Sequence, residues 1–150
     1  MAERPDPAKK AFIAARHLAR KQAVQALYQW ALTGDDMGEV ITQFKAAPDF
    51  ARVDGEYFTD LLRGVAEEAE RLDRTIHSVS ERDPRLIDPV ELGILRLAVY
   101  ELTHRPDVPP KVVVNEAVNL AKTFGAEGSY RFVNSVLDRL LKQAPSPALG

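Results

Sequence analysis

The sequence predicts an all-α protein of six or seven helices, arranged as two small bundles that share one core. Proline-free blocks at 8–47, 49–83, 90–105 and 111–144 leave room for helices, because proline breaks helix interiors. Apolar residues inside these blocks recur every three or four positions, which is the helical period. No segment alternates strictly between apolar and polar residues, as a half-buried strand does.

The first block predicts a long helix from about Ala8 to Thr33, because Gly34 follows as a C-terminal stop signal. A shorter second helix begins after Asp35 or Asp36, either of which is a favourable N-cap. It carries the apolar residues Val40, Ile41 and Phe44.

The third helix begins after Asp54 and has the clearest periodicity in the chain. Apolar residues from Phe58 to Val79 step by three or four positions, which is typical of one buried face over about six turns. A break at Asp83-Pro84 follows. The sequence Asp88-Pro89-Val90-Glu91 then restarts the chain with the features of a capping box, and predicts a largely buried fourth helix.

Two more helices complete the prediction. Prolines between 106 and 110 turn the chain, a fifth helix runs to Gly125, and Gly128-Ser129 opens the last helix. We expect one domain over 8–143, with flexible tails at 1–7 and 144–150.

Composition excludes several function classes. The 150 residues are 45% apolar and 28% charged, as in an ordinary soluble domain. The chain has no cysteine, its three histidines are far apart, and phosphate-loop, dinucleotide and hydrolase motifs are absent. We therefore expect no metal, no cofactor and no enzyme activity. No apolar run spans a bilayer and no signal segment precedes the first helix, so we expect a cytoplasmic protein without membrane contact.

A basic stripe is the most informative charge pattern. Residues 1–33 hold six Lys or Arg against two acids, whereas residues 34–110 hold nine against seventeen. At helical spacing, six residues share an arc of about 140°: Lys9, Lys10, Arg16, His17, Arg20 and Lys21. A basic stripe on an acidic protein favours a polyanion, most often nucleic acid. The alternative is a solvated helix face.

The turn before the last helix is a second candidate nucleic-acid site. Glycines bracket it, and a helix N-terminus offers free amides to a phosphate. The candidate residues are Ser129, Tyr130, Arg131 and Phe132, of which Tyr130 and Arg131 can stack on splayed bases. Core packing is an equal alternative for Phe132, and helix capping for Ser129.

Six segments, in order, resemble the NusB family of transcription antitermination factors. They are Ala23–Trp30, Tyr57–Val65, Ile94–Leu102, Asp107–Pro109, Asn115–Gly125 and Arg131–Asp138. The resemblance covers about residues 10–142, and it is the ordered set rather than any single string that is specific. Two departures are a basic stripe diluted by His17 and Leu18, and a loose match over Ser80–Asp88.

The resemblance implies a fold of two perpendicular three-helix bundles that binds the boxA element of nascent ribosomal or phage RNA. It implies a heterodimer with NusE, the small-subunit ribosomal protein, inside a complex that also contains NusA, NusG and RNA polymerase. The residues that match NusE-interface positions of the family are Tyr28 and Glu91. Tyr28 shares the angle of the basic stripe, so we expect an exposed ring, whereas capping is an alternative role for Glu91.

Two other functions stay open at the level of sequence. The RNA-binding domain of some rRNA cytosine methyltransferases is similar to NusB, but those enzymes need a further cofactor domain and a catalytic cysteine, and this chain has no cysteine. A protein-only helical adaptor would use the basic stripe to dock an acidic partner.

Overall fold

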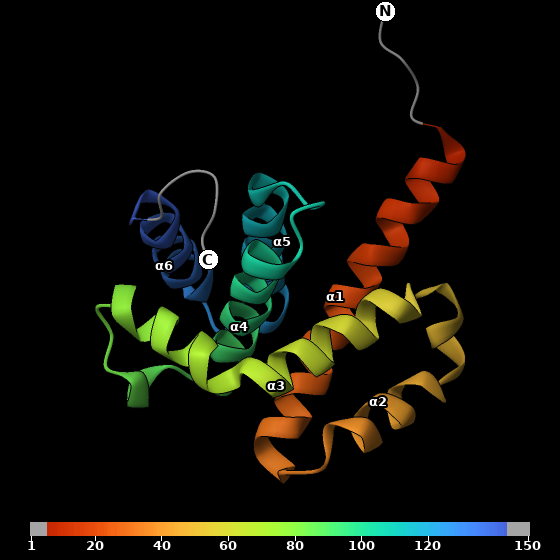
Figure 1. Cartoon of the computed structure of the whole chain (residues 1–150), viewed down its shortest axis with the longest axis horizontal. Coiled ribbons are helices and arrows are strands. Elements are labelled where there is room, and N and C mark those ends of the chain that lie inside the picture. The colour runs from red at the N-terminus through yellow and green to blue at the C-terminus, as the bar shows by residue number, and fades with distance from the viewer. Residues whose placement is uncertain (1–5, 144–150) are drawn as a thin grey trace, which may run out of the picture.

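Six α-helices and two short 3-10 helices make up the computed structural model, which describes residues 6–143 (Figure 1). They are α1 Pro7–Thr33, α2 Met37–Lys45, η1 Pro48–Arg52, α3 Gly55–Val79, η2 Pro84–Leu86, α4 Pro89–His104, α5 Pro110–Phe124 and α6 Ser129–Gln143. The described part of the chain contains no strand, which confirms the all-α prediction. Of the expected tails, 1–5 and 144–150 lie outside the described residues, while Asp6 caps α1 and Pro7 is its first residue.

Helix ends fall where the sequence signals predict them. Gly34 ends α1 with φ 71°, a left-handed conformation that only glycine adopts without strain. The Asp54 side chain accepts a hydrogen bond from the Tyr57 amide at 3.1 Å, and Asp88 and Glu91 complete a capping box on α4. Asp36 is the N-cap residue of α2, but its side chain makes no capping hydrogen bond.

The helices form two groups of three that share a core. Helix α1 packs on α2 and α3, and α4 packs on α5 and α6, while α3 and α4 join the groups. In Figure 1, α4 and α5 cross the direction of α3, in keeping with the two-bundle prediction. The predicted face of α3 is buried almost throughout, at Phe58, Leu61, Leu62, Val65, Leu72, Ile76 and Val79.

The two groups meet most closely where Gly64 of α3 faces Tyr100 of α4. A Cβ atom at Gly64 would lie 2.1 Å from the Tyr100 ring, so only glycine permits this approach. The Tyr100 hydroxyl donates to Asp60 at 2.8 Å, which fixes the ring in place. Burial and the carboxylate of Asp60 together raise the pKa of Tyr100.

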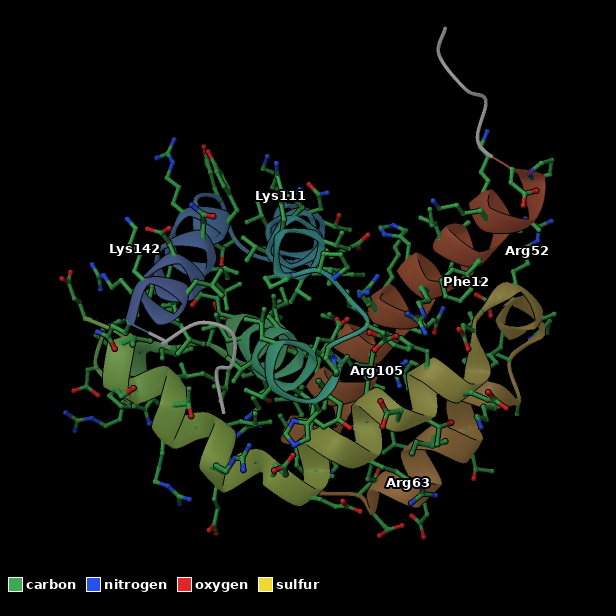
Figure 2. All side chains as sticks on the ribbon, turned by 45° about the horizontal axis from the view of Figure 1, so that its top comes forward. Phe12, Arg52, Arg63, Arg105, Lys111 and Lys142 are labelled. Carbon is green, nitrogen blue, oxygen red and sulfur yellow. The ribbon has the colours of Figure 1, made fainter. Side chains whose placement is uncertain are left out.

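The N-terminal turns of α1 extend beyond the rest of the molecule (Figures 1 and 2). Phe12 and Ile13 are 50% and 55% exposed there, and Lys9 and Lys10 are exposed one turn earlier. From Ala19 onward the same helix is built into the core. Helix α1 therefore has a free outer part and a packed inner part, and the predicted basic stripe runs across both.

Candidate functional site

The outer part of α1 presents the basic residues that remain accessible. Lys9 and Lys10 are exposed, and His17 and Lys21 are half-buried on the helix surface. The His17 ring contacts Glu116 of α5, with Nδ1 2.8 Å from Oε2, so this histidine is oriented by a carboxylate. These four residues stay candidates for nucleic-acid contact.

Arg20 does not belong to that surface, and this corrects the sequence prediction. It is 4% exposed, and its guanidinium donates three hydrogen bonds of 2.8–3.1 Å to the carboxylate of Glu101, itself 2% exposed. The Tyr57 hydroxyl donates to the same carboxylate. Arg20 is therefore a structural residue that ties α1 to α4, because its donors face a buried acid instead of solvent.

Electrostatics strengthens this buried cluster. Burial alone lowers the pKa of Arg20, but the hydrogen bonds and charge of Glu101 outweigh it and raise that pKa. Burial and the neighbouring Glu101 carboxylate likewise raise the pKa of Tyr57. Arg20 is thus charged and Tyr57 neutral at any physiological pH, as the hydrogen-bond directions require.

Arg16 is only partly available. Its guanidinium lies 4.5 Å from the Phe12 ring centre and 4.1 Å from that of Tyr57, and its side chain is 16% exposed. One terminal nitrogen lies 3.3 Å from Asp107, so a protein carboxylate already holds the position that the sequence assigned to a phosphate.

The turn before α6 is built around a buried carboxylate. Glu91 is 4% exposed, and its oxygens accept from Arg82 at 2.6 Å and from the Ser129 hydroxyl at 2.6 Å. The amides of Ser129 and Arg131 are bonded to carbonyls of the turn, at Ala126 and Gly128. In the free protein the side chains of Ser129, 5% exposed, and Glu91 are therefore bonded to each other, and their contacts with RNA and with a partner stay predictions.

Tyr130, Arg131 and Phe132 remain at the surface of this turn. Arg131 is exposed, and its Nε donates to the Tyr130 hydroxyl at 3.2 Å. Phe132 is half-buried, and the Arg82 guanidinium lies 3.7 Å from its ring centre, so one face of the ring is already covered. An open hollow of about 420 Å³ flanks this ring and is lined by Arg82, Arg131 and Arg139 among others.

Sequence reasoning missed Arg82 and Arg139. Both line that hollow, yet they come from segments that are far apart in the sequence. Arg82 lies in the stretch that matches the family loosely, and Arg139 pairs with Glu81 at 2.9 Å. They are recognised as neighbours of Arg131 only in the folded chain, where all three arginines line the same hollow.

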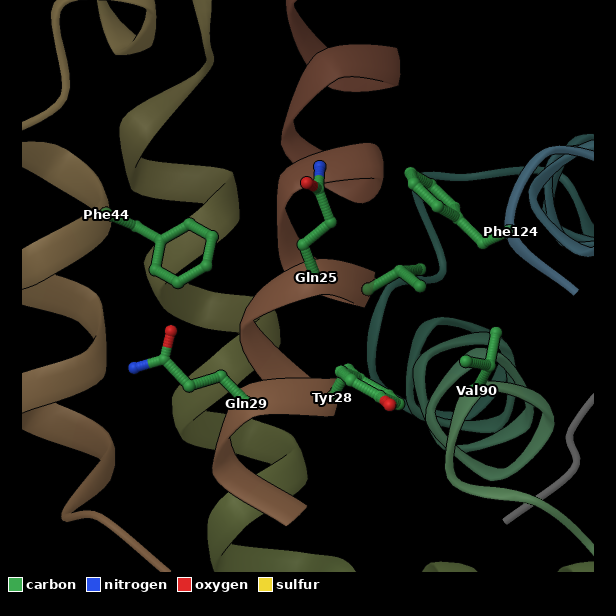
Figure 3. Close-up of a pocket in the computed structure, with 7 residues that line it drawn as sticks. Gln25, Tyr28, Gln29, Phe44, Val90 and Phe124 are labelled. Atoms are coloured by element: carbon green, nitrogen blue, oxygen red, sulfur yellow. The ribbon is translucent and has the colours of Figure 1, made fainter. Parts of the chain in front are cut away.

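Tyr28 lines an open groove of about 570 Å³, beside Val24, Gln25, Gln29, Phe44, Val90 and Phe124 (Figure 3). Its ring is 42% exposed, which confirms the expected exposure, and α1 runs between Phe44 of α2 and Phe124 of α5. Aromatic and apolar side chains with two amides at hand are a typical lining for a protein-binding groove.

Within residues 6–143, no cluster of three or more His, Asp or Glu side chains has the geometry of a metal site. No helix among them combines the length and apolar character that a membrane span requires.

Comparison with known proteins identifies the family of this chain. Residues 17–142 match the NusB family. The chain belongs to the NusB family. A relative named transcription antitermination protein NusB, from Idiomarina loihiensis, is 48% identical over 126 residues, which cover 84% of this chain and 91% of the relative.

Solved NusB structures share the fold. T. maritima NusB superposes with a TM-score of 0.77 at 28% identity, covering 85% of this chain and 91% of that one. A chain in a crystal structure of the antitermination factors NusB and NusE in complex with dsRNA superposes with a TM-score of 0.70 at 28% identity. That match covers 81% of this chain and 92% of the other. These matches confirm the resemblance found in the sequence, including its helical fold.

Proposed function

We propose that this chain is a transcription antitermination factor that binds boxA-type RNA together with NusE. The observation that carries the proposal is its membership of the NusB family, whose curated relatives bear that name and whose solved members include a complex with NusE and RNA. In this proposal the protein is a non-catalytic, cytoplasmic adaptor that requires no cofactor. It joins NusA, NusG and RNA polymerase in the larger assembly.

The RNA-binding face of this proposal has two parts. Lys9, Lys10 and Lys21 of α1 neutralise phosphates, which provides affinity without sequence information. Tyr130 and Arg131 at the start of α6 provide a half-buried ring and an exposed guanidinium, suited to bases splayed from a single strand. His17 and Phe132 border these two parts and add hydrogen bonding and apolar contact.

The NusE-binding face of this proposal is the groove at Tyr28. An exposed tyrosine flanked by half-buried Phe44 and Phe124 fits an anchor residue with an apolar surround. Glu91 supports this face from inside, because it holds the start of α4, and Val90 next to it lines the groove.

Salt dependence of RNA binding tests the proposal. Each phosphate contact contributes a slope of about −0.7 to a plot of log affinity against log salt for a single strand. Replacing Lys9 and Lys10 by glutamine should therefore reduce the magnitude of that slope by about 1.4 and weaken boxA-like and scrambled strands alike. The pair Lys45→Gln with Lys142→Gln, on α2 and α6, removes the same charge elsewhere.

Two results together support the proposal. The parent chain binds boxA-like single strands, and the salt slope changes in the Lys9→Gln, Lys10→Gln variant but not in the Lys45→Gln, Lys142→Gln variant. If the parent chain binds no RNA at low salt but still binds NusE, the protein is a helical adaptor for proteins instead. A duplex of the same sequence serves as a third probe, since a solved NusB–NusE complex contains dsRNA.

A further inference from the structure

Two arginines from different parts of the chain converge on a single carboxylate oxygen. Arg16 of α1 donates to Oδ2 of Asp107 at 3.3 Å, and Arg105, at the C-terminal end of α4, donates to the same oxygen at 3.1 Å. Figure 2 labels Arg105 where α1, α3 and α4 come together, with Phe12 farther out along α1. Asp107 is the outermost member of this group, since its side chain is 51% exposed against 16% and 27% for the two arginines.

Aromatic stacking holds both guanidiniums independently of Asp107. The Tyr57 ring centre lies 4.1 Å from Arg16 and 4.8 Å from Arg105, and Phe12 stacks on Arg16 at 4.5 Å. Tyr57 is itself 3% exposed and held by Glu101. The two arginines would therefore keep their positions if another anion replaced the aspartate.

Each guanidinium also has an N–H donor without a hydrogen-bond acceptor in the described part of the chain. The Nε atoms of Arg16 and Arg105 are buried and have no hydrogen-bond acceptor among the described residues. An aspartate offers two oxygens, whereas a phosphodiester adds ester oxygens to its two charged ones and is a preferred bidentate partner of arginine.

The charges around the two guanidiniums disfavour the binding of a further anion in the free protein. Besides Asp107, Arg16 has Asp54 at 3.7 Å and Arg105 has Asp60 at 3.5 Å. Three carboxylates against two guanidiniums leave one excess negative charge, which repels a phosphate. Burial acts to raise the pKa of Asp107, but the hydrogen bonds and charge of Arg105, with the hydrogen bond from Arg16, hold that pKa below its ordinary value.

We propose that Arg16 and Arg105 form a seat for one phosphate of the RNA backbone, and that Asp107 occupies this seat in the free protein as an internal competitor of RNA. This inference rests on the proposed RNA-binding function. Lys9 lies seven residues before Arg16, two helical turns away on the same face and about 10 Å along the axis. A strand that follows Lys9 along α1 therefore reaches the seat, which adds Arg105 and Asp107 to the predicted interface.

The test compares two substitutions that remove the same charge. Asp107→Asn opens the seat, whereas Asp49→Asn changes an exposed aspartate of η1 that forms no ion pair with a described residue. Affinity for a boxA-like single-stranded RNA is measured in the full chain over a salt series. Asp107→Asn should raise the affinity at least about threefold at low salt, because no carboxylate then has to be displaced. It should leave the salt slope unchanged, since RNA makes the same phosphate contact in the parent chain once it has displaced Asp107.

A second substitution locates the gain. Adding Arg105→Gln to Asp107→Asn should remove the gain in affinity and reduce the magnitude of the salt slope by about 0.7, because one half of the seat is lost and its phosphate contact with it. Arg105→Gln alone should lower both below the parent values, since RNA displaces Asp107 when it binds. That single variant decides the question even if Asp107→Asn loses helical circular dichroism.

Three results would overturn the inference: equal effects of Asp107→Asn and Asp49→Asn, a weaker affinity in Asp107→Asn, or an unchanged slope in Arg105→Gln. In each of these cases the parent chain still binds RNA, so the proposed function survives. A parent chain that binds no RNA overturns both, and the two failures are thereby distinguishable.

Discussion

Arg20 and Lys21 are neighbours in the sequence, but the fold gives them opposite environments. Arg20 donates to a carboxylate that is 2% exposed, whereas Lys21 stays on the helix surface. Breaking a buried ion pair leaves an uncompensated charge in a site of low dielectric, which costs far more than the loss of a surface charge. One substitution at each position therefore separates a structural role from a binding role.

We expect Arg20→Ala to lower the free energy of unfolding by about 3–5 kcal/mol, because Glu101 is left buried and unpaired. Lys21→Ala should change it by less than about 0.5 kcal/mol and weaken RNA binding instead. Urea denaturation followed by circular dichroism measures the first effect. Equal stability of the two variants would contradict the structural role of Arg20.

Tyr28 is the residue on which the partner-binding proposal depends most. Tyr28→Asp removes an aromatic anchor and adds a charge that would be desolvated in the interface, so NusE binding should weaken by about 2 kcal/mol or more. Leu32→Asp is the matched control: it lies one turn further along α1, is 60% exposed, and does not line the groove. If calorimetry finds similar losses for both, the interface lies elsewhere.

Residue exposure was predictable only where nothing from another element covers the helix. Helical angles correctly predicted that Lys9, Lys10 and Tyr28 are exposed. The same angles failed for Arg20, because an angle identifies the face of a helix but not the partner that packs on it. The partner here is Glu101, 81 residues away in the sequence.

At the scale of elements, local signals decide where helices begin and end, whereas the break inside α3 has no such signal in the sequence. Gly34, Asp54 and Asp88 act within one turn, so the sequence is sufficient to place those boundaries. The break in helical geometry at Glu68 of α3 has φ −112° and ψ 16°, and no proline marks it. Glu68 pairs with His104 of α4, a contact that periodicity does not encode.

The close approach of α3 to α4 makes Gly64 a sensitive position. Gly64→Ala should destabilise the protein by about 1–3 kcal/mol, because its Cβ would overlap the Tyr100 ring. Gly93→Ala is the control in α4, where a Cβ would meet Leu27 at an ordinary 3.6 Å. There the gain in helix propensity, about 0.8–1 kcal/mol, should stabilise the protein or leave it unchanged. Destabilisation of both variants to the same extent, measured by thermal melting, would refute the packing argument.

At the scale of the whole molecule, the two proposed interfaces adjoin. Phe124 lines the groove at Tyr28 and is followed directly by the turn that leads to Tyr130 and Arg131. Val90 of the groove adjoins Glu91, which holds Ser129 of that turn. A partner bound in the groove therefore contacts the elements that orient the RNA-binding turn, so we expect binding of NusE and RNA to be coupled.

Coupling must be reciprocal, because it is a free energy shared by the two binding events. The most direct measurement is therefore the affinity for boxA-like and scrambled single-stranded RNA, each with and without saturating NusE. We predict that NusE raises the affinity for boxA-like RNA by at least about fivefold, raises that for the scrambled strand less, and loses this effect in Tyr28→Asp. If boxA-like and scrambled RNA bind equally whether or not NusE is bound, the central claim that this protein is a boxA-binding antitermination factor is wrong.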